Sequence, residues 1–378
     1  PGWYSVTIAK EGFIPWQKKL RVQGEIVTKT DPFLFPTNPS LSPLTTVGIE
    51  HPTLSPDGTK IAYIIPLQSG QNGLVATKAG LWTYELVERP LGFNRDQRQV
   101  AISRDLFNFS DSKLIWSPDS SEIMVNKDTT VRIYQAIKID DITDVSLTYT
   151  TLLQSWKDEK NAILKQKLAA FKQPIIDIAT ESARIISFSP DESKILYEAT
   201  ASATVAVVIN PPLIGTNPTE ENRTIEKGNL YVYDSREDKN YLIMQKDEVA
   251  KFHSPTPTPS PTPKTGTIKP AIQAKILPKT SPNQINTQNC ALEETILGTC
   301  DNLMSQLHWF PTSRHIVVTL AGKIDILEYD RTNWVTVYSG PFVNNFMAPW
   351  PNGSRIIVMT NLNPGVSSLP NLYTVNLR

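Results

Sequence analysis

Sulfur and histidine are scarce in this sequence, which holds 2 cysteines and 4 histidines in 378 residues. The histidines form no H-E-x-x-H pair, and Cys290 and Cys300 have no second cysteine or histidine pair nearby, so we expect no metal site. The sequence also lacks a Walker A loop, a G-x-G-x-x-G loop and a G-x-S-x-G nucleophile elbow. We therefore expect no cofactor and assign no catalytic residue.

Neither sign of charge is in excess, since 37 Lys and Arg residues balance 37 Asp and Glu residues. A nucleic-acid-binding protein usually has a basic surplus, so nucleic acid is not an expected partner. No run of about 20 apolar residues is present, which excludes a membrane-spanning helix within this sequence. We expect a monomer that reaches a membrane only through an anchor upstream of Pro1.

Proline, in contrast, is abundant, with 30 residues, and five of these prolines begin the same pattern. An isoleucine follows each of them five positions later, and three copies read Ser-Pro-Asp, as at Ser55-Pro56-Asp57. The five pairs are Pro56 and Ile61, Pro118 and Ile123, Pro190 and Ile195, Pro311 and Ile316, and Pro351 and Ile356. Such a proline-led corner predicts a turn between two strands, in which the Asp side chain bonds to its own backbone.

Each turn is followed by a strand that is apolar on both faces, as in Ile61-Ala62-Tyr63. Such a strand is buried on both sides, which is typical of the inner strands of radially packed sheets. Third strands are expected at 81–84, 131–134, 230–233, 324–327 and 372–375, and fourth strands at 241–244 and 334–338. Four strands on a period of about 40 residues describe a β-propeller blade. We predict five blades, with six as the alternative, and a ring-closing strand within residues 44–49.

This repeat resembles the TolB-type, WD-like propeller repeat over residues 45–378, with its SPDG hairpin followed by an apolar strand. The resemblance implies an all-β propeller fold. It implies little about function, because one propeller fold hosts many activities.

Residues 1–35 form a separate β fragment, with strands expected over 4–8 and 18–27 and a hairpin turn at Lys10-Glu11-Gly12. The motifs Pro1-Gly2-x-Tyr4-x-Val6, Lys10-x-Gly12-Phe13-x-x-Trp16, Val22 and Gly24-Glu25 resemble the C-terminal part of a PEGA domain. That family is a small β-sandwich of bacterial cell-envelope proteins, so the resemblance implies an extracytoplasmic location. An unrelated β-hairpin is the alternative. A proline-rich linker over 36–44 would separate this partial β-sandwich from the propeller.

Two insertions interrupt the predicted blades. Residues 153–180 predict a helical insertion with Ser155 as its N-cap, docked on the flank or one rim of the ring. A Pro/Thr-rich insertion over 252–289 predicts a disordered loop, because it has too little apolar surface to bury. Cys290 and Cys300 at its end are candidates for one disulfide, and two free or buried thiols are the alternative.

Five repeats without a catalytic motif indicate a non-enzymatic cell-envelope protein that uses a propeller as a binding or scaffold platform. Its partner would be an envelope protein or a cell-wall glycan, and exposed Trp82 or Trp334 would favour a glycan. The first-strand positions expected to face the central channel are Thr53, Ile115, Ser187, His308 and Ala348. The alternative is a propeller enzyme of the polysaccharide-lyase or glycoside-hydrolase type, which predicts ionisable partners beside His308 at one channel mouth.

Overall fold

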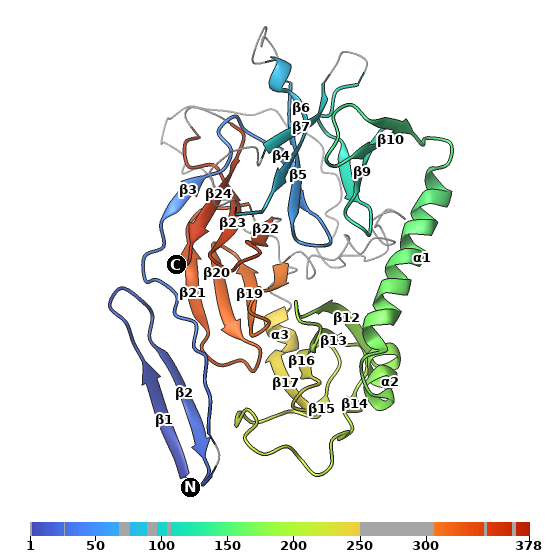
Figure 1. The fold of residues 1–378 in the computed structure, drawn as a ribbon. Helices are drawn as coiled ribbons and strands as arrows, with labels where there is room; N and C mark the ends of the chain where they lie inside the picture. Colours follow the sequence, from blue (N-terminus) through green and yellow to red (C-terminus); the bar gives the residue numbers. More distant parts are fainter. Residues whose placement is uncertain are drawn as a thin grey trace, which may run out of the picture.

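The fold is mostly β with few helices, as the computed structural model shows (Figure 1). The structure describes residues 2–25, 27–67, 76–88, 97–103, 107–249, 306–343, 346–364 and 368–378. The predicted loop over 252–289 and the pair Cys290 and Cys300 lie outside these residues.

Within the described residues, five antiparallel sheets have four strands each, which is the build of propeller blades. Sheet I consists of β4 (Glu50–Leu54), β5 (Lys60–Ile65), β6 (Gly80–Glu85) and β7 (Gln97–Ile102). Sheet II consists of β8 (Lys113–Trp116), β9 (Glu122–Lys127), β10 (Thr130–Gln135) and β11 (Ile142–Asp144). Sheet III consists of β12 (Ala183–Phe188), β13 (Lys194–Ala199), β16 (Leu230–Asp234) and β17 (Lys239–Met244).

The two C-terminal sheets follow the same plan. Sheet IV consists of β18 (Leu307–Trp309), β19 (His315–Leu320), β20 (Lys323–Glu328) and β21 (Val335–Ser339). Sheet V consists of β22 (Met347–Pro349), β23 (Arg355–Thr360), β24 (Asn371–Asn376) and β3 (Leu41–Pro43). The short elements are η1 (Ala76–Lys78), β14 (Ala203–Thr204), β15 (Thr224–Ile225) and α3 (Lys246–Val249).

The closing strand β3 joins the two ends of the repeat region, and it lies a few residues before the predicted position. Leu41–Pro43 pairs with Tyr373–Val375, so the prediction of 44–49 was wrong, and residues of the expected linker belong to sheet V. Pro43 has no N–H to donate, and the outermost position in the sheet needs no donor on its free side. Leu44 and Thr45 leave the strand and donate their N–H groups to the Leu372 carbonyl at 2.8 and 3.3 Å.

The Ser-Pro-Asp turns are held by local hydrogen bonds, as predicted. In the second copy, the Ser117 hydroxyl donates to Asp119 Oδ1 at 2.6 Å, and the same oxygen accepts the Ser121 N–H at 3.0 Å. The copies that begin at Ser55 and Ser189 repeat both bonds. Burial raises the pKa of Asp191, but the donors Ser189 and Ser193 outweigh it and hold that pKa at about 2. These carboxylates are therefore turn-forming groups.

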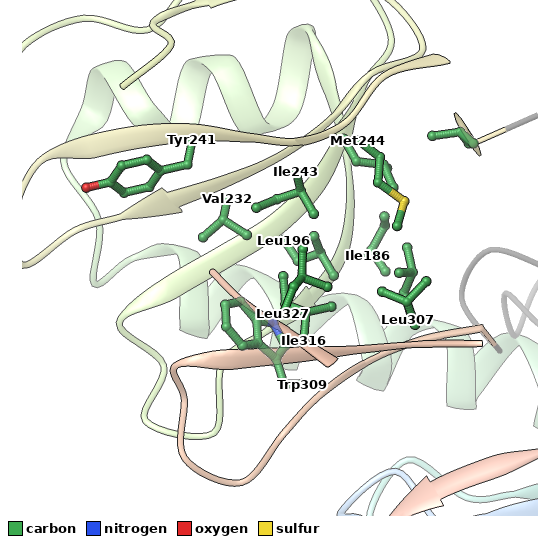
Figure 2. Close-up of a cluster of buried hydrophobic side chains, with 13 residues drawn as sticks. Ile186, Leu196, Val232, Tyr241, Ile243, Met244, Leu307, Trp309, Ile316 and Leu327 are labelled. Carbon is green, nitrogen blue, oxygen red and sulfur yellow. The ribbon is translucent and has the colours of Figure 1, made fainter. Parts of the chain in front are cut away.

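Four of the boundaries between sheets are packed directly, sheet against sheet. Residues five and seven positions after each proline lie on one face of the strand, and the residue between them lies on the other. At these four boundaries, the face packs against the neighbouring sheet. The shared clusters join the sheets in the order II, I, V, IV, III. Figure 2 shows the cluster between sheets III and IV, which includes Leu196, Val232, Trp309 and Ile316. The apolar strands are thus buried on both sides, as their sequences indicate.

Helices α1 (Tyr149–Leu168) and α2 (Gln173–Glu181) fill the fifth boundary, between sheets II and III. Met124 of sheet II packs with Leu153 and Trp156 of α1, whereas Ile195 of sheet III packs with α2. No apolar cluster of the described residues combines sheets II and III. Between its two contacts, α1 exposes six successive residues, 158–163.

The helical insertion was predicted, but its place was not. It lies between two sheets, and neither the flank nor a rim of the ring is its main contact. Ser155 lies inside α1, which begins at Tyr149 because Leu153 already packs against sheet II. Within the part of the chain that the structure describes, no helix is both long and apolar enough to cross a membrane.

The N-terminal fragment is the expected hairpin, formed by β1 (Gly2–Ile8) and β2 (Trp16–Val22). The second strand ends at Val22 and not at the predicted Val27, because a turn with Glu25 at φ 67° follows it. Segment 33–37 then runs back along the hairpin turn, where the Ile14 N–H donates to the Phe35 carbonyl at 2.8 Å.

A buried ionic cluster fixes this hairpin to sheet IV. Lys18 Nζ lies 2.6 Å from both Glu328 Oε2 and Asp330 Oδ2, and Trp16 donates its indole N–H to Glu328. Burial raises the pKa of Asp330, but the ammonium of Lys18 outweighs this and holds the pKa at about 2. Close by, burial lowers the pKa of His315 to about 4, so that this residue is neutral at pH 7. Hairpin and sheet IV therefore form one packed body.

Candidate functional site at the first strands

The five predicted channel residues all lie on the first strand of a sheet, and these first strands are neighbours. β4 contacts β8, and β18 contacts both β12 and β22. Thr53, Ile115, Ser187 and His308 are half-buried, whereas Ala348 is fully buried. The two apolar members pack against neighbours, Ala348 in the cluster of sheets V and I and Ile115 in the cluster with α1. A channel-facing role for these residues stays a prediction.

Polar atoms without a partner gather along the same strands. Among the residues that the structure describes, thirteen buried side-chain N and O atoms have no hydrogen-bond partner, and six of them lie on a first strand or just before one. They belong to Glu50, Thr53, Ser112, Ser187, Gln306 and Trp309. A buried polar atom costs free energy unless water or a ligand satisfies it, so atoms of this kind mark a place where polar groups can bind. The second strands hold three more of these atoms, on Tyr63, His315 and Thr319, so the first strands hold the larger share.

A charged cluster lies where the first strands of sheets I and II begin. Burial raises the pKa of Glu50 above its usual value. The charge of His51 acts in the opposite direction, and the nearby carboxylate of Asp111 raises the pKa further. The backbone is irregular here, with a bulge between Glu50 and Thr53 and positive φ at His51 (49°) and Asp111 (62°). Bulges of this kind redirect side chains and are over-represented near active sites. We call Glu50, His51 and Asp111 the rim cluster.

Sequence reasoning missed the rim cluster. The histidine pattern gives His51 no partner, and the charged site that the sequence predicts lies beside His308. Glu50 and Asp111 are separated by about 60 residues of sequence, with no motif to link them. The repeat offered one usable signal, because Glu50 begins the first strand of sheet I and Asp111 lies two positions before the first strand of sheet II.

The two candidate tryptophans both have partners inside the fold. Trp82 donates its indole N–H to the Lys78 carbonyl, and Trp334 donates to Asp325 Oδ2, each at 2.8 Å. Both rings are partly buried against apolar clusters. Each indole N–H therefore already has a partner within the fold, and a role of either ring in glycan binding stays a prediction.

No protein-family model and no curated protein matches the chain. Solved structures do show a distant likeness. A TolB protein from Acinetobacter baumannii has 11% identity and a TM-score of 0.23, covering 87% of this chain and 54% of that one. A protein assigned as TolB from Agrobacterium tumefaciens has 10% identity and the same TM-score of 0.23, covering 84% of this chain and 71% of that one. The chain is thus distantly similar to TolB structures over most of its length.

Proposed function

We propose that this protein is a non-enzymatic binding or scaffold protein of the bacterial cell envelope, built on a five-bladed β-propeller that follows a PEGA-like hairpin. Its ligand is an envelope protein or a cell-wall glycan, and its binding surface is the one formed by the first strands of the sheets. Five sheets joined by packed boundaries supply a rigid platform.

The observation that carries this proposal is the set of buried, unpartnered polar atoms on the first strands. Thr53 Oγ1 and Ser187 Oγ come from sheets I and III, so the set belongs to several sheets. Polar groups held on a rigid frame can fix the orientation of a ligand at little entropic cost.

Site-specific photo-crosslinking tests the position of this surface. A photo-reactive amino acid replaces His51 at the rim or, as the control, Leu147, which is fully exposed beside α1. We expect protein or glycan adducts from envelope extract at position 51 and few at position 147. The purified ligand should then bind the Thr53→Val and Ser187→Ala double variant about tenfold more weakly. Equal labelling at both positions, or unchanged affinity, would contradict the proposal.

The rim cluster supports a second candidate, a glycan-cleaving propeller enzyme. A carboxyl group with a raised pKa beside a second carboxylate is the arrangement that supplies a general acid, and Glu50 and Asp111 have those properties. A panel of cell-wall polysaccharides, assayed for new reducing ends or unsaturated products, tests this candidate. Turnover that the Glu50→Gln variant loses would favour the enzyme, and turnover by neither protein would favour the binding platform.

A further inference from the structure

The segment between β13 and β16 of sheet III contains no charged residue over 21 positions, 199–219, although one residue in five is charged in the whole chain. It includes β14, which pairs with β15 in a small two-stranded ribbon, and then the loop Asn210-Pro211-Pro212-Leu213-Ile214-Gly215. All six residues of this loop are exposed, Leu213 by 47% and Ile214 by 73%. The molecule thus presents aliphatic side chains to solvent where its charge is lowest. We call residues 210–215 the apolar loop.

The base of the apolar loop is firmly held. The N–H groups of Val208 and Ile209 both donate to Asp238 Oδ2, at 2.8 and 2.9 Å. On the other side, Asn217 Nδ2 and Thr219 Oγ1 each donate to Asp330 Oδ2 at 2.7 Å. The loop is therefore held in its exposed position before any partner arrives, which lowers the entropic cost of binding.

A second exposed patch lies at the open end of the N-terminal hairpin. Trp3 and Tyr4 are each about half exposed, and Val27 is exposed as well. Two exposed basic residues, Lys19 and Arg21, lie on the neighbouring strand, and Lys19 Nζ is 5.5 Å from the centre of the Trp3 ring. Aromatic and basic residues together are typical of the interfacial region of a membrane, where rings meet headgroups and cations meet anionic lipids.

The apolar loop and this hairpin end reach the same limit of the molecule, the lower edge in Figure 1. A flat surface laid against that edge touches both. We propose that this end of the protein docks on the surface of an anionic lipid bilayer. Leu213 and Ile214 enter the acyl boundary, Trp3 and Tyr4 lie at headgroup level, and Lys19 and Arg21 attract anionic headgroups.

The residue types at this end of the protein favour a lipid surface over a protein as the binding partner. A pocket for a protein partner needs one compact patch, whereas here aliphatic, aromatic and basic groups are spread over two separate segments at one edge. The absence of charge in 199–219 also matches insertion into an apolar medium, in which an ionised group is costly. Membrane docking involves none of the first-strand residues, so it can be tested independently of the proposed function.

Vesicle sedimentation tests the docking. The whole chain is mixed with phosphatidylcholine vesicles that contain or lack phosphatidylglycerol, and the bound fraction is measured at two salt concentrations. We expect binding to the anionic vesicles, and a loss of about tenfold in the Leu213→Ser and Ile214→Ser double variant. The matched control is the Ile137→Ser and Ile139→Ser double variant in the connection between β10 and β11, whose targets are exposed by 51% and 70%. Strand β10 lies far from this edge in Figure 1. The control variant should bind like the wild type.

Substituting the basic residues tests the docking independently of the apolar loop. Lys19→Glu with Arg21→Glu should weaken binding to anionic vesicles by about tenfold and leave neutral vesicles unaffected. Thermal melting checks folding, and Ile214→Ser alone is the second variant if the double one is unstable. A wild type that stays in the supernatant, or loop and control variants that bind equally well, would overturn the proposal. Unchanged vesicle binding together with loss of a protein partner would assign the apolar loop to a protein.

Discussion

Two boundaries of sheet III are built in different ways. Toward sheet IV, two sheets press directly on each other, and Leu196 and Ile316 lie in one cluster. Toward sheet II, the corresponding face carries Ile195 and Tyr197, but α2 covers it. Both faces come from the same alternating strand, β13, so the strand pattern by itself does not decide what covers each face. What covers each face depends on the segments that precede and follow the strand in the sequence.

The comparison also shows how sequence insertions are accommodated. The proline turns of sheets II and III are 72 positions apart, and the excess over one repeat forms the helices. Sheets IV and V have turns 40 positions apart and pack without an intermediary. An amphipathic helix needs an apolar surface, and the nearest one is the sheet face on each side of it. Four predictions follow this contrast, in descending order of expected effect.

Removing the carboxylate of Asp330 should have the largest effect. Asp330 is fully buried at the boundary of sheets III and IV and bonds to Lys18, Asn217 and Thr219. Asp330→Ala leaves a buried ammonium with one partner fewer and should lower the free energy of unfolding by about 3–5 kcal/mol. Urea denaturation measures this loss. The Lys18→Met and Asp330→Asn double variant is the control, and its loss should be smaller than the sum of the single losses.

Truncating Leu196 should destabilise the whole protein, because it opens a cavity between two sheets. The side chain is completely buried in the cluster shared by sheets III and IV. Leu196→Ala should cost about 3 kcal/mol, and fluorescence and circular dichroism should report the same transition. A loss below about 1 kcal/mol would show that this boundary is loosely packed.

Truncating Trp156 should act locally at the helix-filled boundary. Trp156 holds α1 on sheet II, and α1 has only three buried residues. Trp156→Ala should raise amide hydrogen exchange across 149–168 by about a hundredfold while global unfolding changes by only about 1 kcal/mol. Hydrogen exchange with mass spectrometry compares it with Leu196→Ala. A uniform rise in exchange over all sheets would contradict the local character of this boundary.

The features that could be predicted from the sequence are those that depend on a few adjacent residues. The Ser-Pro-Asp corners close through bonds between residues at most five positions apart, so the pattern at Ser117 or Ser189 carries the whole interaction. The third strands and the existence of a helix near Trp156 followed from residue patterns in the same way.

Features that depend on distant partners were misplaced or missed. β3 pairs with Tyr373, more than 300 residues away, and nothing in Leu41-Ser42-Pro43 identifies that partner. The rim cluster needs β4 beside β8, and the ionic cluster needs Lys18 beside Asp330. Each of these contacts becomes visible only when the sheets are placed relative to one another.

The smallest expected effect comes from the polar links at the two boundaries. Toward sheet IV, the Asp191 N–H donates to Ser313 Oγ at 3.0 Å, and toward α1 the next residue, Glu192, pairs with Lys167 at 2.9 Å. Ser313 is buried, so Ser313→Ala leaves the Asp191 N–H without its partner and should cost about 1 kcal/mol, independent of salt.

The pair of Lys167 and Glu192 is largely exposed, so Lys167→Ala should cost at most about 0.5 kcal/mol, and less at high salt. Urea denaturation at two salt concentrations separates the two cases. Ser120→Ala is the control, because Ser120 accepts the Asp57 N–H at 3.1 Å across the directly packed boundary of sheets I and II and should behave like Ser313→Ala. Equal costs for Ser313→Ala and Lys167→Ala would mean that the helices join sheets II and III as tightly as sheets III and IV join each other.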